Sequence, residues 1–250
     1  MNASHRVAAV QFQPELGNVD ANLEKVSHLV RQAFSAGAEW VALPEFFTTG
    51  ITFDDSMLAG HRPLDGVPMQ MLKELAVEGG AVVGGSYLAE SDGHVYNTFV
   101  LALNDGQVFT HDKDFPSGPI EHAYYAGGED SEFVSLLREC GVAVEDRFIP
   151  SRNDNNRDGV FLSENVNVGV ALCGEMSRHR TATRMQGKVD VVLAGSAWPA
   201  IDPDVGFPGM SRDQLVDLNT TLLQMLQNAP SQLAQLLGVP VIHANLVGSH

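Results

Sequence analysis

Three residues that can support acyl-transfer chemistry each follow an apolar segment of the chain. Glu45 follows WVALP, Lys113 follows GQVFTHD and Cys173 follows VNVGVAL. Apolar runs of this length are typical of buried strands. In layered α/β proteins, functional side chains gather where strands end at the carboxyl edge of a sheet. We therefore expect a carboxylate, an amine and a thiol to meet at one site.

These three groups have complementary roles in attack on a carbonyl carbon. A thiol attacks as its thiolate, which a nearby cation such as Lys113 or the N-terminus of a helix starting near Glu175 favours. The Glu45 carboxylate can take the thiol proton and later give it to a leaving amine. Lys113 and the backbone N–H of Gly174 can hold the oxyanion of a tetrahedral intermediate. Gly174 also lets a substrate approach the backbone closely.

Each residue has a structural alternative when it is taken singly. A cysteine at the end of a strand is more often a small buried hydrophobe. Glu45 follows a proline and can occupy the start of a helix, where acids are favoured. Lys113 lies in HDKD and can be one solvated charge among several. The presence of all three in one chain favours the catalytic interpretation.

Alternating strands and helices are predicted to position these residues. Residues 6–14 predict a buried strand ended by Pro14, 18–38 a helix stopped by Gly37, and 40–47 the next strand, which together form a βαβ unit. Further helices are expected at 70–80, 177–188 and 215–238, the last divided or kinked by Pro230. Further strands are expected at 81–90, 94–103, 106–113, 165–173, 189–198 and 239–245, with 94–103 and 106–113 antiparallel.

This order predicts an α/β protein with helices outside its sheets. The 250 residues suit a single domain, and the polar stretch 128–160 predicts a surface excursion rather than a domain boundary.

The composition narrows the classes of partner. A formal net charge of −16 disfavours binding to nucleic acid or to anionic membranes. No segment approaches the roughly 20 apolar residues that span a bilayer, and the amino terminus lacks a signal-peptide pattern. Two cysteines make no disulfide framework, so the expected location is the cytoplasm. No HExxH or paired Cys/His spacing occurs, so neither a metal nor a cofactor is expected.

Four segments of the chain resemble the landmarks of the nitrilase superfamily of carbon–nitrogen hydrolases. In chain order they are LPEFFTTG, KDFPSGPIEHAYYAGG, GVALCGEM and GVPVIHANLVG, and the similarity runs from about residue 6 to the end. The resemblance implies a four-layer α-β-β-α sandwich with Glu45 as general base, Lys113 as oxyanion stabiliser and Cys173 as nucleophile. It also implies a homodimer or larger homo-oligomer that pairs through its helical faces.

Further residues acquire expected roles from the same resemblance. Members similar to aliphatic amidases carry another glutamate where Glu121 stands, and it would position the substrate or the attacking water. Phe46, Tyr124 and Trp198 follow the landmarks and would shape the pocket, although packing in the core or rim is the alternative for each. His111 and His122 flank the lysine segment and are weaker candidates for the pocket lining.

The chain departs from the family pattern at two places. The position of Gly174 is often aromatic or acidic in the family, so specificity is not carried over. Family chains usually continue beyond HANLVG with a closing strand pair, whereas this chain stops at His250. The C-terminal strands are therefore expected to be missing or truncated.

The activity we expect is hydrolysis of the non-peptide C–N bond of a small amide through a thioester, with release of ammonia or an amine. A nitrilase and an N-carbamoyl amide hydrolase are the enzymatic alternatives. From a different class, the chain can be a catalytically silent binding module that keeps the same fold.

Overall fold

The structure is a computed structural model of the chain, and it describes residues 4–51, 55–116, 159–163, 166–198, 204 and 211–248. The predicted excursion at 128–160 lies almost wholly outside these residues. Glu121, His122 and Tyr124 lie outside them too, so their expected roles remain predictions.

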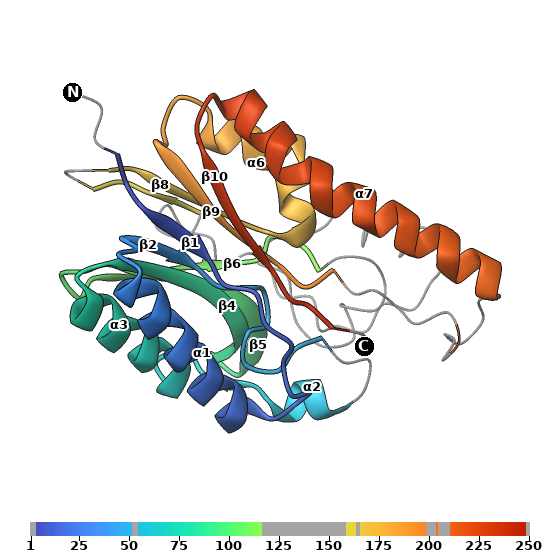
Figure 1. Cartoon of the computed structure of the whole chain (residues 1–250), viewed down its shortest axis with the longest axis horizontal. Coiled ribbons are helices and arrows are strands. Elements are labelled where there is room, and N and C mark those ends of the chain that lie inside the picture. Colours follow the sequence, from blue (N-terminus) through green and yellow to red (C-terminus); the bar gives the residue numbers. More distant parts are fainter. Residues whose placement is uncertain are drawn as a thin grey trace.

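The strands form two sheets (Figure 1). The first has the order β1-β2-β4-β5-β6, with β3 paired to β4, and it is parallel from β1 to β4 and antiparallel from β4 to β6. Its strands are β1 (Val7–Ala9), β2 (Trp40–Ala42), β3 (Arg62–Pro63), β4 (Val82–Ser91), β5 (His94–Ala102) and β6 (Val108–Asp112). The second sheet has the order β10-β9-β8-β7, and only β7 is antiparallel to its neighbour. Its strands are β7 (Val160–Phe161), β8 (Val168–Leu172), β9 (Val191–Ser196) and β10 (Val241–Asn245).

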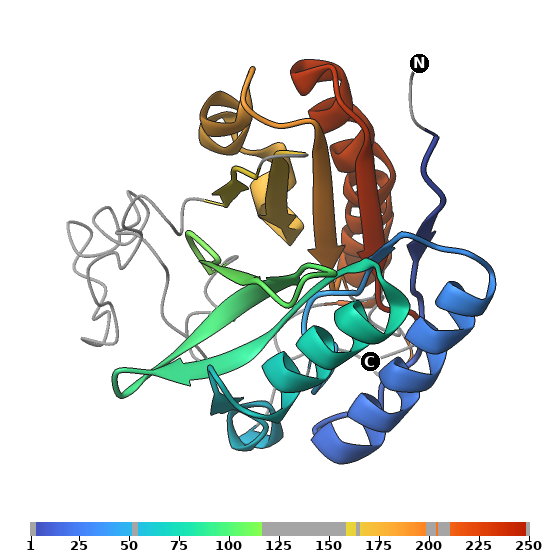
Figure 2. The ribbon, with the colours of Figure 1, turned by 90° about the vertical axis from the view of Figure 1, so that its left-hand side faces the viewer.

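Helices cover the outer face of each sheet, as the two views show (Figures 1 and 2). On the first sheet lie α1 (Val19–Ser35) and α3 (Val67–Gly79), with the short α2 (Asp55–Ala59) near its edge. On the second lie the 3₁₀ helix η1 (Cys173–Ser177), α6 (His179–Met185) and α7 (Arg212–Leu237). The predicted four-layer α-β-β-α sandwich is confirmed. No helix within the described ranges is both long and apolar enough to cross a membrane.

Three apolar clusters fill the spaces between the four layers. Side chains of α1 and α3 pack on the first sheet, and side chains of α6 and α7 pack on the second. Between the sheets, Phe99 and Leu101 from β5 share a cluster with Leu172 from β8 and Leu193 from β9. Burial of this surface stabilises the stacking of the sheets by about 25 cal/mol per Å². The stacked sheets form the rigid mount on which the site is built.

Local sequence signals explain where the first helix begins and ends. The Asn18 side chain accepts a hydrogen bond from the N–H of Ala21, which caps α1. Val26 and Val30 lie on its fully buried face. Gly37 follows the helix at a φ of 83°, which glycine adopts without strain. The predicted helix and its stop are confirmed.

Two details of the predicted elements are wrong. The buried strand expected at 6–14 is only Val7–Ala9, and Val7 is 50% exposed because β1 has β2 as its single strand neighbour in the described sheet. Pro230 does not divide α7, which is one helix of 26 residues. Ala229 and Leu233 flank this proline and are buried against the second sheet, so packing keeps the helix continuous across Pro230.

The pairing of β10 with β9 leads to a pH-dependent prediction. Ser196 Oγ hydrogen-bonds with His243 Nε2 at 2.8 Å, and burial lowers the pKa of His243 to about 4. An unfolded histidine has a pKa of about 6.5, so between these values the unfolded chain binds more protons. The stabilisation is present above pH 6.5 and is lost as the pH falls toward 4. It amounts to at most about 3 kcal/mol.

Urea unfolding of the wild type and His243→Gln at pH 7 and pH 5 checks this. The variant is expected to lose less stability on acidification than the wild type, whereas His28→Gln, an exposed change on α1, should match the wild type. An equal loss in the wild type and His243→Gln contradicts the prediction.

Candidate active site

Glu45 is buried in the seam between the two sheets. It lies three residues beyond β2, where the N–H groups of Leu43 and Phe47 donate to carbonyls of β4 and keep the chain beside that strand. Its side chain is 1% exposed. Oε1 accepts from Lys113 Nζ at 2.9 Å and from Asn97 Nδ2 at 2.8 Å, while Oε2 accepts from the N–H of Ala197 at 3.1 Å. The carboxylate thus joins donors from both sheets.

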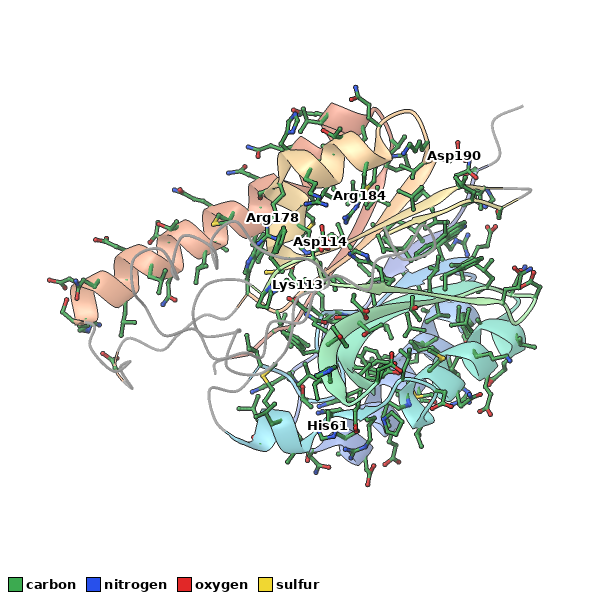
Figure 3. The ribbon with its side chains drawn as sticks, turned by 180° about the vertical axis from the view of Figure 1, so that it is seen from behind. His61, Lys113, Asp114, Arg178, Arg184 and Asp190 are labelled. Carbon is green, nitrogen blue, oxygen red and sulfur yellow. The ribbon has the colours of Figure 1, made fainter. Side chains whose placement is uncertain are left out.

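Lys113 directly follows β6 and is fully buried. Its N–H donates to the carbonyl oxygen of Asn97 at 2.8 Å, which continues the pairing of β5 and β6 by one residue. Asn97 therefore binds Lys113 through its backbone and Glu45 through its side chain. Figure 3 shows Lys113 and Asp114 between the two halves of the sandwich. The structure brings together two of the three predicted catalytic residues in a direct ion pair.

Cys173 is the first residue of η1, directly after β8, and is 3% exposed. Its φ is 48°, a left-handed conformation that costs a non-glycine residue about 1–3 kcal/mol. Phe46, next to Glu45, has a φ of 53°. Such conformations persist only when the surrounding structure enforces them, and they cluster at functional sites. The predicted strand-to-helix turn at the cysteine is confirmed, with a 3₁₀ helix in place of the first α-helical turn.

Close packing at Gly195 brings the turn of Glu45 to the end of β8. Gly195 on β9 pairs with Leu172, the residue before Cys173. A Cβ at Gly195 would lie 2.9 Å from the Glu45 nitrogen and 3.1 Å from the Leu43 oxygen. Only glycine admits so close an approach of two backbones. The ends of β2, β8 and β9 therefore meet within one small region.

A second buried network lies beside these residues. The Glu175 carboxylate accepts from the N–H of Asp114 at 2.7 Å, from the N–H of Leu172 at 2.8 Å and from His111 Nε2 at 3.2 Å. Arg184 on α6 donates to both Asp114 carboxylate oxygens, at 2.8 and 2.7 Å. Figure 3 shows Asp114 and Arg184 close together. These bonds link the loops that carry Lys113 and Cys173.

Glu175 and His111 shift each other's pKa. Burial lowers the pKa of His111, but the charge and hydrogen bond of Glu175 outweigh it, and the net pKa is raised. Burial likewise raises the pKa of Glu175, but the charge and hydrogen bond of His111, the charge of Arg184 and the N–H of Asp114 together outweigh it, so the net pKa is lowered. Each of the two groups therefore favours the charged form of the other.

His111, Asp114 and Glu175 are residue types that can bind a metal ion. One ligand atom each from His111, Asp114 and Glu175 lies within 4.8 Å of the others. The carboxylates, however, already accept backbone N–H groups and the Arg184 guanidinium, whose positive charge opposes a cation there. The donor set fits an internal ion network better than a metal centre.

The structure describes three further residues that were predicted to contact the substrate, but it does not test those roles. Phe46 is fully buried in the cluster beneath the first sheet. The Trp198 ring packs on the cluster beneath α6 and α7 and lies edge-on to His243 at 6.4 Å. Gly174 follows Cys173 in η1 and is partly exposed. Their contacts with substrate remain predictions.

Sequence reasoning missed Asn97, Asp114 and Arg184. One signal in the sequence points to Asn97. It places a polar amide inside the mostly apolar segment VYNTFVLAL, residues 95–103. No signal in the sequence points to Arg184, because a basic residue on a short helix is usually exposed to solvent.

Two large cavities lined by described residues lie away from this site. One of about 730 Å³ is bordered by Trp40, Val82 and Leu103, and one of about 910 Å³ by Val191 and Val241. These residues start parallel strands or end antiparallel ones, so both cavities adjoin the opposite ends of the strands from Glu45 and Cys173. Neither cavity is lined by Glu45, Lys113 or Cys173.

Comparison with known proteins finds one matching family and several similar enzymes. The profile of the carbon-nitrogen hydrolase family matches residues 6–201. A nitrilase of Pyrococcus abyssi is 34% identical over 101 residues, 38% of each chain, and a 2-oxoglutaramate amidase of Bacillus subtilis is 30% identical over 153 residues, 58% of this chain and 57% of the amidase. The matches thus span less than two thirds of these relatives.

Solved structures share the fold at low identity. The CN-hydrolase superfamily protein XC1258 of Xanthomonas campestris has a TM-score of 0.68 at 17% identity, covering 98% of this chain and 76% of the other. An amidase of Nesterenkonia sp. AN1 has a TM-score of 0.65 at 17% identity, with 98% and 80% covered. The reported structure of that amidase carries acrylamide added to its active-site cysteine.

Asn97→Leu tests the support of the buried ion pair. The change keeps the side-chain size but removes the donor to Glu45, leaving a buried carboxylate one hydrogen bond short. The expected loss is about 1–3 kcal/mol of stability and at least about tenfold in the amide hydrolysis expected from the sequence.

Asn22→Leu is the matched control, because Asn22 is equally buried and bonds to Glu15 and Thr48. It should lose stability without a comparable loss of turnover in its folded fraction. Equal turnover losses in the two variants would contradict a specific role for Asn97.

Proposed function

The chain belongs to the carbon-nitrogen hydrolase family, and from that premise we propose that it hydrolyses a small amide through a thioester on Cys173. The observation that carries the proposal is the buried contact of Glu45 with Lys113 beside the strained turn at Cys173. A purely structural pair in that place gains little, since burying two charges costs about as much as their attraction returns.

The first half-reaction forms the thioester. Glu45 takes the proton of the Cys173 thiol as sulfur attacks the amide carbonyl carbon. Lys113 Nζ and the N–H of Gly174 stabilise the resulting oxyanion. The C–N bond then breaks, and ammonia or an amine leaves with the proton from Glu45.

The second half-reaction releases the acid. Glu45 removes a proton from water, which attacks the thioester carbon. Glu121, by its place in the chain, orients this water or the substrate. The C–S bond breaks and the proton returns to sulfur, which regenerates the free enzyme. Acid–base steps of this kind need no redox change and no co-reactant beyond water.

An amide is preferred over a nitrile because Glu121 stands where amidase-like members carry their additional glutamate. The similarity to the 2-oxoglutaramate amidase supports that preference. The similarity to the Pyrococcus nitrilase keeps attack on a nitrile carbon as the second candidate, with the same thiol as nucleophile. Hydrolysis of an N-carbamoyl amide is the third.

The state of the protein in the cell is part of the proposal. We propose a single domain over 1–250 that acts in the cytoplasm as a homodimer or larger homo-oligomer. The shared cluster between the sheets supports one domain. Val216 and Leu223, which share one face of α7, are 40% and 53% exposed, and such apolar exposure on a helical face favours subunit pairing. Tyr124 and Trp198 remain proposed pocket residues.

Ammonia release from a panel of short aliphatic amides, nitriles and carbamoyl amino acids tests the proposal. Cys173→Ala is expected to reduce turnover at least about 1,000-fold, since removal of a nucleophile abolishes the covalent route. Cys140→Ser is the matched control and should retain wild-type turnover.

Each result bears on a different part of the proposal. Activity confined to nitriles would overturn the amide preference. Turnover that persists in Cys173→Ala would overturn the thioester route. A folded wild type with no activity on the panel, whose two cysteines react slowly and equally with iodoacetamide, would favour the silent binding module.

A further inference from the structure

One carboxylate joins the loop of the nucleophile to the loop of the lysine. Glu175 stands two residues after Cys173, and its two oxygens accept the N–H of Leu172 and the N–H of Asp114. Leu172 immediately precedes Cys173, and Asp114 immediately follows Lys113. The bonds are short, at 2.8 and 2.7 Å, and Glu175 is fully buried. No other side chain in the described part of the chain bonds to both loops in this way.

We propose that Glu175 is a positioning residue that holds the Cys173 thiol in register with Lys113 and Glu45, and that His111, Asp114 and Arg184 lock it in place. Its effect on turnover rests on the proposed function. Its effect on the thiol itself does not, because thiol reactivity is measurable without a substrate.

The bond to Leu172 explains how the strained cysteine is held. The Glu175 side chain reaches back over η1 to the N–H at the end of β8, as the N3 glutamate of a capping box does. The loop closed by this bond contains Cys173 at its φ of 48°. Hydrogen bonds to an ionised carboxylate are among the strong ones, so this bond can offset the strain of a left-handed cysteine. Without this bond the turn can relax and carry the sulfur away from the lysine.

The bond from the N–H of Asp114 to Glu175 fixes the backbone next to Lys113. Lys113 donates its own N–H to Asn97, and the next N–H along the chain is held by Glu175. The lysine backbone is therefore tied on one side to the first sheet and on the other to the loop of the cysteine. This arrangement sets the distance between the two loops by a single rigid carboxylate.

Additional contacts hold the Glu175 side chain and the two loops that it joins. His111 Nε2 donates to Glu175 Oε1 at 3.2 Å, and the Arg184 guanidinium binds Asp114 through both carboxylate oxygens. Arg178, at the junction of η1 and α6, lies over the Phe115 ring at 4.8 Å. Residues 111–115 are thus joined to residues 172–184 at several points.

Glu175→Gln is the variant that tests the proposal. Glutamine keeps the shape, but its amide nitrogen faces one of the two N–H groups, so one loop must detach. Glu39→Gln is the matched control, because Glu39 also accepts from a histidine, His5 Nδ1 at 2.7 Å, and from a backbone N–H, that of Arg6 at 3.3 Å. It lies at the opposite ends of the strands from Cys173.

The measurement is the rate of Cys173 alkylation by iodoacetamide as a function of pH, read by peptide mass spectrometry on the folded protein. Loss of position predicts that Glu175→Gln reacts about tenfold more slowly at pH 7, with the midpoint of its pH profile moved upward, because the thiolate loses Lys113. Glu39→Gln should follow the wild-type profile.

The opposite sign would overturn the proposal. If Glu175 acted only through its negative charge, its removal would favour the thiolate and speed alkylation at pH 7. An unchanged profile in folded Glu175→Gln would overturn it as well.

His111→Gln decides the matter if Glu175→Gln does not fold. This change removes the His111 hydrogen bond to Glu175 but leaves both bonds from backbone N–H groups. Alkylation of Cys173 is expected to be about threefold slower than in the wild type. A wild-type profile would overturn the proposal. A wild type that hydrolyses nothing on the amide and nitrile panel would count against the proposed function, and would leave these profiles interpretable.

Discussion

The Glu45 carboxylate, buried between two sheets, is the constraint on which the rest of the site depends. Removing one partner of such a buried pair costs about 3–5 kcal/mol, because the remaining charge cannot reach water. Its donors come from β5, from the residue after β6 and from the residue after β9. Sliding or separation of the two sheets at this end would break the bond from Ala197 and expose the buried carboxylate and its ion pair to water. The Glu45 carboxylate therefore helps to fix the position of one sheet on the other, and it is also a candidate acid–base group.

The sandwich in turn supplies the rigidity that the site needs. Apolar side chains between the sheets fix their spacing, and Gly195 lets the turn of Glu45 press against β9. Left-handed conformations at Phe46 and Cys173 flank the ion pair. Strain of this kind is stable only where packing and hydrogen bonds over-determine the backbone. The bonds of Glu175 and the bonds of Asn97 hold the backbone near these residues.

Much of this arrangement was predictable from the sequence. Periodicity and glycine stops gave the order of helices and strands, and the residues that follow apolar runs gave Glu45, Lys113 and Cys173. Asn97 and Arg184 were not predictable, because their importance depends on partners distant in the chain that only the stacking of the sheets brings close. The exposure of β1 also depends on tertiary context, since an edge strand and a central strand can share one apolar sequence. Pro230 shows the reverse, a local rule overridden by packing.

The most direct test of the central claim is peptide mass spectrometry of the protein quenched in acid during turnover of an amide that it hydrolyses. The thioester route predicts that the acyl group of that amide is found on Cys173, that Cys140 is unmodified, and that the acyl group accumulates only in protein that keeps Lys113 and Glu45. Steady turnover with no acyl group on Cys173 at any quench time, or with the acyl group on another residue, would contradict it.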